Sequence, residues 1–273
     1  MKFLKNQENH RWLDKTALIT GASSGIGATI ARELASHGLS VILVARRLDR
    51  LKEVASQIIQ TGGKAQILAA DLSTAQGREV LIRQLNRFSI RVDVLVNNAG
   101  FGWYGYYADM PWVTADDMLQ VNVAAVMHLT RLLLPPMLAR RSGWVINIGS
   151  IAGGFPNQGV AVYSAAKAFM DAFTTSLYRE LRGSGVSISV VRLGPVRTEF
   201  FQTARSRPAG GSIPGERFAI SVENAARSVW SLLLRPRRYI YVPAYMWLSR
   251  LFAITFSGLV DQLGPLLLRR RNA

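Results

Sequence analysis

Short apolar runs alternate along this chain with longer stretches in which apolar residues recur every three or four positions. The short runs are rich in β-branched residues, as in buried strands, and the longer stretches have the period of an amphipathic helix. The strands predicted in this way are 16–20, 40–45, 64–69, 92–96, 145–148, 187–192 and 239–242. The main helices predicted between them are 26–34, 48–60, 74–88, 115–141 and 222–234. This alternation predicts an α/β fold, with a doubly wound parallel sheet of about seven strands and helices on both faces.

A glycine-rich turn follows the first predicted strand at once. It reads Gly21-Ala-Ser-Ser-Gly25-Ile-Gly27, and a helical pattern begins within it. The free N–H groups and positive end of a helix favour a phosphate, and glycine lets the phosphate approach closely. The spacing is neither that of a P-loop nor the G-x-G-x-x-G fingerprint. We therefore expect the phosphates of a dinucleotide to lie against this turn, at Gly21, Ser23, Ser24, Gly25, Ile26 and Gly27.

The same turn also matches the G-x-S-x-G elbow of serine hydrolases. That chemistry needs a histidine downstream of the serine and its acid. The only histidines are His10, His37 and His128. His37 lies at the end of the first predicted helix, His128 lies inside a helical run, and no histidine follows residue 128. The hydrolase interpretation is therefore rejected.

Two arginines, Arg46 and Arg47, end the second predicted strand. In dinucleotide folds an acidic residue at this place binds the ribose 2′-hydroxyl, whereas an arginine accommodates a 2′-phosphate. Asp49 comes too late to take the acidic role, because it falls in the first turn of the next helix. The sequence therefore predicts NADP(H) as cofactor, with Arg46 as the better candidate and Arg47 as the second.

Ligands of doubly wound sheets lie beyond the carboxyl ends of the strands. The glycine turn, the arginine pair, Asp71, Asn97 and Ser150 all follow predicted strands, so they converge on one edge of the sheet. Gly194-Pro195 follows the sixth strand and would approach a nicotinamide ring there. Asn122 is a lone amide in an apolar stretch, so it either bonds to water and backbone or serves this site.

Tyr163 and Lys167 are four residues apart in a predicted helix, so both side chains lie on one face. An ammonium beside a phenol favours the phenolate, so we expect the pKa of Tyr163 to be lowered. Ser150 comes from a strand end, thirteen residues before the tyrosine. Together a hydroxyl, an acidic phenol and a cation suit the polarisation and protonation of a carbonyl oxygen.

These motifs resemble those of the short-chain dehydrogenase/reductase family, a Rossmann-type fold, over roughly residues 13–242. The matching residues are Thr20-Gly-x-x-x-Gly-x-Gly27, Asn97-Asn-Ala-Gly100, Asn122, Ser150, Tyr163-x-x-x-Lys167 and Gly194-Pro195. The resemblance implies that Tyr163 is the acid/base and that Ser150 hydrogen-bonds the substrate oxygen. It also implies that Lys167 binds the nicotinamide ribose and that Asn122 holds a water in a proton relay.

The resemblance further implies where the rest of the dinucleotide lies. Asp71 and Leu72 would flank the adenine, and Asn98 would approach the adenosine ribose. The remaining cofactor-binding candidates are Ala99, Gly100, Pro195, Val196 and Thr198. Family members are commonly dimers or tetramers, which implies a homodimer or homotetramer.

Composition limits the setting of the protein. The chain has 273 residues and no cysteine, so we expect a reducing, cytoplasmic location and no thiolate metal site. No metal site is predicted from other residues. The N-terminus has no apolar core of a secretory signal. The 33 basic and 17 acidic residues give a net charge of +16, which indicates an anionic partner. Nucleic acid is not expected, because the basic residues are spread along the chain without a recognition motif.

Residues 243–273 depart from a minimal reductase and are predicted as a C-terminal extension of a domain formed by residues 1–242. The extension is apolar and ends in Arg269-Arg-Arg271, while Arg250, Asp261 and two prolines divide it into short pieces. One or two amphipathic helices could lie in an anionic membrane surface. The alternatives are that they pack on the domain, cover the substrate mouth or form a subunit contact.

The leading hypothesis is an NADPH-dependent oxidoreductase that reduces a ketone or aldehyde, or oxidises the alcohol. Trp103, Tyr104, Tyr106 and Tyr107 indicate a hydrophobic substrate such as a 3-oxoacyl or steroid-like ketone. Residues 203–215 are expected to be a mobile loop, either a lid or a plain surface loop. The alternative function is a catalytically silent NADP(H)-binding regulatory or scaffold protein.

Overall fold

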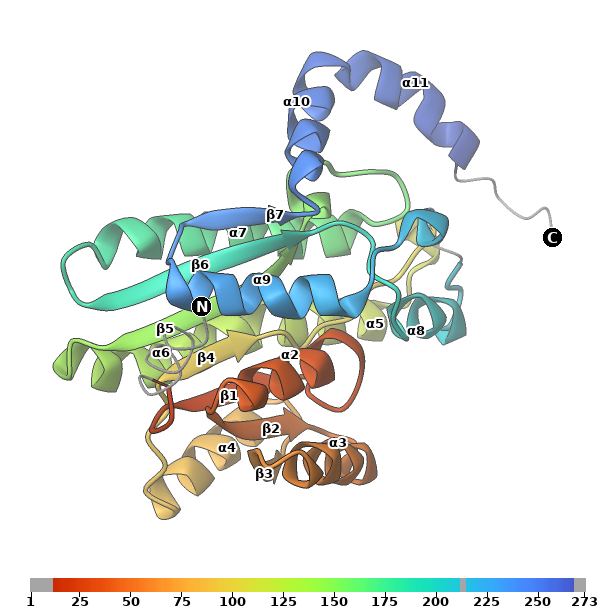
Figure 1. The fold of residues 1–273 in the computed structure, drawn as a ribbon. Coiled ribbons are helices and arrows are strands. Elements are labelled where there is room, and N and C mark those ends of the chain that lie inside the picture. The colour runs from red at the N-terminus through yellow and green to blue at the C-terminus, as the bar shows by residue number, and fades with distance from the viewer. Residues whose placement is uncertain (1–11, 212–214, 268–273) are drawn as a thin grey trace.

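The structure is a computed structural model that describes residues 12–211 and 215–267. Its centre is a seven-stranded sheet in the order β3-β2-β1-β4-β5-β6-β7, with every neighbouring pair parallel (Figure 1). The strands are β1 Thr16–Thr20, β2 Ser40–Ala45, β3 Lys64–Ala69, β4 Val94–Asn97, β5 Gly143–Ser150, β6 Val186–Leu193 and β7 Tyr239–Val242. The parallel sheet predicted from the sequence is confirmed.

Helices cover both faces of this sheet (Figure 1). One face packs against α2 (Gly25–Ser36), α3 (Leu48–Gln60) and α9 (Val222–Leu234). The other packs against α4 (Ala75–Arg87), α6 (Ala125–Ala139) and α7 (Ala161–Glu180). Side chains alternate between the faces, so Ile19 of β1 belongs to the first apolar core and its neighbour Leu18 to the second.

A cluster of aromatic rings closes the amino edge of the sheet, opposite to the edge where ligands of such folds lie. Trp12 is fully buried, and its ring lies 5.1 Å from that of Trp144 and 5.4 Å from that of Trp230. His37, at the end of α2, stacks on Trp230 with ring centroids 3.8 Å apart. These contacts join the segment before β1 to α2, β5 and α9, so they hold both ends of the domain together.

Most predicted elements agree with the structure, and the differences lie around the site edge. The long helix predicted at 115–141 is three pieces, α5 (Trp112–Leu119), a π-helical turn (Gln120–Ala124) and α6. Part of the predicted mobile loop is helix α8 (Phe200–Ser206). Short 3₁₀ turns occupy Tyr107–Asp109, Ile151–Gly153, Glu216–Phe218 and Ala244–Met246.

Two further helices follow the last strand and lie outside the sheet, α10 (Trp247–Thr255) and α11 (Ser257–Leu267) (Figure 1). The amphipathic extension predicted for this part of the chain is therefore two helices. The predicted division of the chain after residue 242 stays a prediction. Arg269–Arg271 lie outside the described residues.

One described stretch, Trp112–Ala139, is long and apolar enough to cross a membrane by length and composition alone. In this fold it covers a face of the sheet, with Leu129, Leu133 and Met137 of α6 in the core of that face. A share of 33% of its apolar window is buried inside the protein.

Truncation of a central strand residue tests this core. Leu95 of β4 is fully buried and pairs with Leu18 and Val145 on the two flanking strands. We expect Leu95→Ala to lower the free energy of unfolding by about 2–5 kcal/mol, because it removes packed methyl groups and leaves a cavity. Urea unfolding followed by circular dichroism measures the change. The control is Ile59→Ala, at a side chain that is 57% exposed on α3, which should cost far less.

Candidate active site

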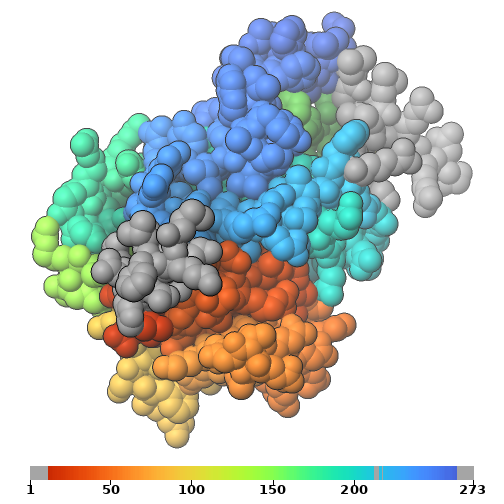
Figure 2. Space-filling model, viewed as in Figure 1, coloured from red at the N-terminus to blue at the C-terminus, as the bar shows by residue number. Residues whose placement is uncertain are grey.

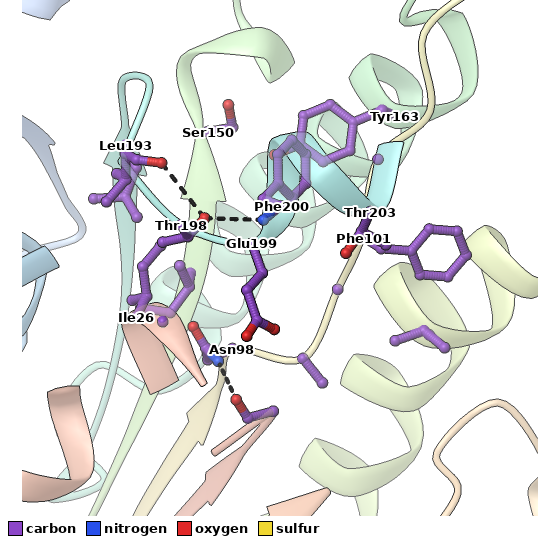
Figure 3. A pocket seen from close by; sticks show the side chains of 18 of the residues that line it. Ile26, Asn98, Phe101, Ser150, Tyr163, Leu193, Thr198, Glu199, Phe200 and Thr203 are labelled. Carbon is purple, nitrogen blue, oxygen red and sulfur yellow. Dashed lines mark hydrogen bonds between the residues drawn. The ribbon is translucent and has the colours of Figure 1, made fainter. Parts of the chain in front are cut away.

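One pocket of about 550 Å³ lies beyond the carboxyl ends of the strands. It is lined by nearly all the residues that the sequence singles out. They are Gly21, Ser23, Ser24, Gly25, Ile26, Gly27, Arg46, Arg47, Asp71, Leu72, Asn98, Ala99, Gly100, Ser150, Tyr163, Lys167, Pro195, Val196 and Thr198. Asn97, which the sequence placed at the same edge, and Asn122 do not line it. Figure 3 shows Asn98 and Ile26 on one side of this pocket, and Ser150, Tyr163 and Phe200 on the other.

The glycine turn brings the start of α2 close to the end of β4. Gly21 has a φ of +66°, a conformation that side chains rarely adopt. A β-carbon on Gly27 would overlap the Gly21 carbonyl oxygen and lie 2.5 Å from Asn98 Nδ2. The turn therefore leaves the first N–H groups of α2 uncovered by side chains, as a phosphate would require.

Hydrogen bonds lock this turn to the loop after β4. The Thr20 hydroxyl accepts from the backbone N–H groups of Asn98 and Ala99, both at 2.9 Å. The Asn98 side-chain amide donates to the Thr20 carbonyl oxygen, also at 2.9 Å. Asn98 thus holds two strand ends together in addition to lining the pocket.

The two arginines after β2 differ in their contacts. Arg47 donates to the hydroxyls of Ser23 at 3.2 Å and Ser24 at 2.6 Å, and it forms an ion pair with Glu199 at 2.9 Å. Arg46 lies 4.0 Å from Asp71 and is mostly exposed. Arg47, which the sequence ranked second, is therefore the arginine that contacts the glycine turn.

The carboxyl end of β5 and the first turns of α7 bring together Ser150, Tyr163 and Lys167. The Ser150 hydroxyl lies close enough to the Tyr163 phenol to lower the pKa of the phenol. The Lys167 ammonium donates to the Ile148 carbonyl oxygen at 2.8 Å, and its Nζ lies 5.6 Å from the centre of the Tyr163 ring. One helical turn thus places the phenol and the ammonium side by side, as the sequence predicts.

Burial decides the proton affinities of both groups. It raises the pKa of Tyr163 to about 12, partly offset by the Ser150 hydroxyl. This direction is opposite to the lowered pKa that we expected from Lys167. Burial also lowers the pKa of Lys167 to about 8, against the opposing charge of Asp171. Near neutral pH the phenol is protonated, and the ammonium keeps most of its charge.

An ion pair between Asp171 and Arg192 lies beside Lys167, and its carboxylate stabilises the ammonium. It was not predicted from the sequence. Asp171 accepts from Arg192 Nε at 3.0 Å, and Arg192 Nη1 reaches the Tyr241 hydroxyl at 2.8 Å. Asp171 is four residues after Lys167, so the i, i+4 spacing that links Tyr163 to Lys167 could have revealed it. Burial raises the pKa of Asp171, while Arg192 favours the charged form.

Asn122 holds the loop beside the site without lining the pocket. It is fully buried in the π-helical turn, and its amide both donates to the Phe101 carbonyl oxygen at 3.0 Å and accepts from the Phe101 N–H at 3.1 Å. A β-carbon on Gly100 would lie 2.8 Å from Asn122 Oδ1. The side-chain amide is therefore committed to the backbone, one of the two outcomes expected for it.

The remaining wall of the pocket is aromatic. Phe200 of α8 lies 5.4 Å from the Tyr163 ring, and Arg207 covers the Phe101 ring at 3.6 Å. Trp103 and Tyr104 line the pocket as expected, whereas Tyr106 and Tyr107 do not.

Two hydrogen bonds to backbone carbonyl oxygens hold the segment after α8 against this wall. Trp103 Nε1 donates to the Pro208 carbonyl oxygen at 3.1 Å, and Gly211 N–H donates to the Tyr104 carbonyl oxygen at 2.7 Å. Glu199, Phe200, Phe201, Thr203 and Arg207 line the pocket, and these hydrogen bonds hold the following residues against its wall. The choice between a lid and a plain surface loop stays a prediction.

This arrangement presents a hydroxyl, a protonated phenol and an ammonium within one partly apolar cavity. Such a set can bind a carbonyl oxygen and deliver a proton to it. Within residues 12–211 and 215–267, no group of three or more His, Asp or Glu side chains is placed to hold a metal ion.

Comparison with known proteins agrees with this site. The sequence model of a family described as short chain dehydrogenase matches residues 15–209. Ketoacyl reductase HetN of Nostoc sp. is 38% identical over 214 residues, which is 77% of this chain and 73% of that protein.

Two solved structures share the fold over most of the chain. A short-chain dehydrogenase from Sphingobium yanoikuyae in complex with NADPH has a TM-score of 0.77 and 28% identity, covering 95% of this chain and 98% of its own. A 3-oxoacyl (acyl-carrier-protein) reductase from Agrobacterium tumefaciens with NADP bound has a TM-score of 0.74 and 29% identity, covering 84% and 93%. The family match contains every residue that the sequence assigned to the site, and this chain belongs to the short chain dehydrogenase family.

Proposed function

We propose that this protein is an NADPH-dependent reductase of apolar ketones. The observation that carries the proposal is that Ser150, Tyr163 and Lys167 line the same pocket as the glycine turn, with the Lys167 ammonium 5.6 Å from the centre of the Tyr163 ring. A catalytically silent protein would have no need to keep a phenol, a hydroxyl and a buried ammonium together.

The dinucleotide fits the glycine side of the pocket. Gly21 and Gly27 leave the helix N-terminus open, and Ser23, Ser24 and Arg47 offer polar groups beside it. No acidic residue ends β2, so the position that would bind a ribose 2′-hydroxyl carries arginine in place of a carboxylate. The relatives with NADPH or NADP bound support the same choice. When bound, the cofactor supplies a hydride to the carbonyl carbon.

The protein side of the reaction is proton delivery. Tyr163 donates its proton to the carbonyl oxygen as that atom gains the electron pair of the broken C=O π bond. Ser150 donates a hydrogen bond to the same oxygen, and the Lys167 charge stabilises the phenolate that remains. The raised pKa of Tyr163 keeps the proton on the phenol, which suits reduction better than oxidation.

The substrate side of the pocket supports an apolar ketone, and a 3-oxoacyl chain fits best. Phe101, Tyr104, Phe155 and Phe200 line it, and the two related reductases carry ketoacyl or 3-oxoacyl in their names. A steroid-like ketone is the second candidate. The homodimer or homotetramer implied by the family resemblance stays a prediction.

Removal of one oxygen atom tests the acid. Tyr163→Phe should lower kcat for NADPH-dependent ketone reduction about 10²–10⁴-fold, because general-acid catalysis contributes that much. NADPH binding, measured by fluorescence titration, should change little. The matched control is Tyr178→Phe, at the exposed far end of the same helix, which should keep full activity. Retained turnover in Tyr163→Phe would refute the assigned role.

Cofactor preference tests the arginines. Arg47→Ser should raise KM for NADPH about tenfold or more and change KM for NADH little, because a charge-assisted phosphate contact contributes at least 1.5 kcal/mol. Arg46→Ser should have a smaller effect in the same direction. Arg50→Ser, on the exposed face of α3, is the control. An unchanged NADPH/NADH ratio in both pocket variants would contradict the assignment of NADPH.

The pH profile tests the lysine. Because the pKa of Lys167 is about 8, kcat/KM for reduction should fall as the pH rises through about 8 and the ammonium loses its proton. Asp171 raises this pKa, so Asp171→Asn should move the midpoint to lower pH. Asp261→Asn, an exposed carboxylate in α11, should leave the midpoint in place. A midpoint that does not move in Asp171→Asn would show that another group titrates.

A further inference from the structure

The two C-terminal helices and the 3₁₀ turn before them carry a large apolar surface that the rest of the domain leaves exposed. We call it the C-terminal apolar face, formed by Tyr245, Trp247, Leu248, Leu251, Phe252, Ile254, Phe256 and Leu259, each at least 42% exposed. In Figure 2 these helices project beyond the rest of the molecule. Contiguous exposed apolar patches of this kind mark interaction sites.

The helices are attached beside the mouth of the active-site pocket. Phe252 of α10 packs edge-on against Phe155, with ring centroids 6.1 Å apart, and Gln158 Nε2 donates to the Val260 carbonyl oxygen of α11 at 3.5 Å. Phe155 and Gln158 both line the pocket. The C-terminal apolar face therefore adjoins the part of the pocket wall formed by Phe155 and Gln158, which we call the rim.

The side-chain types favour a lipid surface over a protein partner. Tryptophan and tyrosine prefer the interface of a bilayer, and leucine, isoleucine and phenylalanine the acyl region below it. Helices α10 and α11 have 9 and 11 residues, so each is too short to span a membrane and suited to lie in its surface. The charge fits anionic head groups, since residues 243–273 contain four arginines and one aspartate within a chain of net charge +16.

We propose that α10 and α11 dock the protein on an anionic phospholipid bilayer, with the Phe155–Gln158 rim of the pocket turned towards the lipid. An apolar ketone dissolved in the membrane then reaches the pocket without crossing water. The docking itself does not depend on the proposed function; the entry route does.

Vesicle co-sedimentation tests the docking with the full-length protein. The protein should bind vesicles of phosphatidylcholine and phosphatidylglycerol, and binding should weaken about tenfold or more on vesicles of phosphatidylcholine alone, because several arginines each contribute about 1 kcal/mol at an anionic surface. High salt should weaken binding to the mixed vesicles. Equal binding to both vesicle types, or no binding, overturns the proposal.

Matched double variants place the contact. The double variant Ile254→Ser with Phe256→Ser should weaken vesicle binding about tenfold or more. The reason is that it removes the favourable free energy of transferring two apolar side chains from water into the lipid. Ile59→Ser with Phe88→Ser makes the same chemical change at the ends of α3 and α4 and should leave binding unchanged. These four side chains are 72%, 49%, 57% and 54% exposed in the order given, so both variants should fold, which thermal unfolding checks.

A second copy of the chain is the competing occupant of this face. In that case the native protein would be an oligomer without vesicles, and only Ile254→Ser with Phe256→Ser would dissociate it in light scattering. That result, together with a lack of vesicle binding, would refute docking on lipid.

The entry route has its own measurement. The C-terminal variant should reduce a long-chain ketone held in vesicles more slowly, while its turnover of a short water-soluble ketone should equal that of the native protein. Equal loss on both ketones would contradict the entry route. Absence of any turnover in the native protein would refute the proposed function and leave the docking result standing.

Discussion

The burial of one ammonium organises the catalytic half of this molecule. Lys167 is 5% exposed, and a charge in that position is stable only because the Ile148 carbonyl oxygen and the Asp171 carboxylate compensate for lost water. Ile148 lies in β5 near its carboxyl end, and Asp171 is held by Arg192 of β6. The lysine therefore depends on the register of two neighbouring strands, and the phenol of Tyr163 takes its position from the same helix.

The sequence predicts much of this architecture because strand and helix periods differ clearly along the chain. The bounds of 16–20, 40–45, 64–69 and 239–242 agree with β1, β2, β3 and β7 residue for residue. Parallel strands bring their carboxyl ends to one edge, so residues that follow strands could be assigned to a common site before any coordinates. Nearly all of them line one pocket, although their roles in binding and catalysis stay predictions.

The features that could not be predicted from the sequence depend on tertiary packing. The spacing of Tyr163 and Lys167 indicates proximity, but the direction of the phenol pKa depends on how much water the surrounding walls exclude. Residues 203–215 are rich in Arg, Pro and Gly, which is typical of a loop, so helix α8 could not be predicted. The helix forms because Phe201 and Ala204 are buried there. The π-helical turn at Asn122 is equally hidden, because its amide bonds to Phe101, distant in sequence.

The tryptophans lie in different parts of the protein, so their fluorescence can report on different events. Three indoles, Trp12, Trp144 and Trp230, are gathered at the amino edge of the sheet, so their emission responds to whether the domain is folded. Trp103 lines the pocket and would respond to a ligand. Trp112 and Trp247 are 71% and 53% exposed on separate helices, so both are open to soluble quenchers. Single-tryptophan versions of the chain could therefore follow folding, ligand binding and surface contacts as separate fluorescence signals.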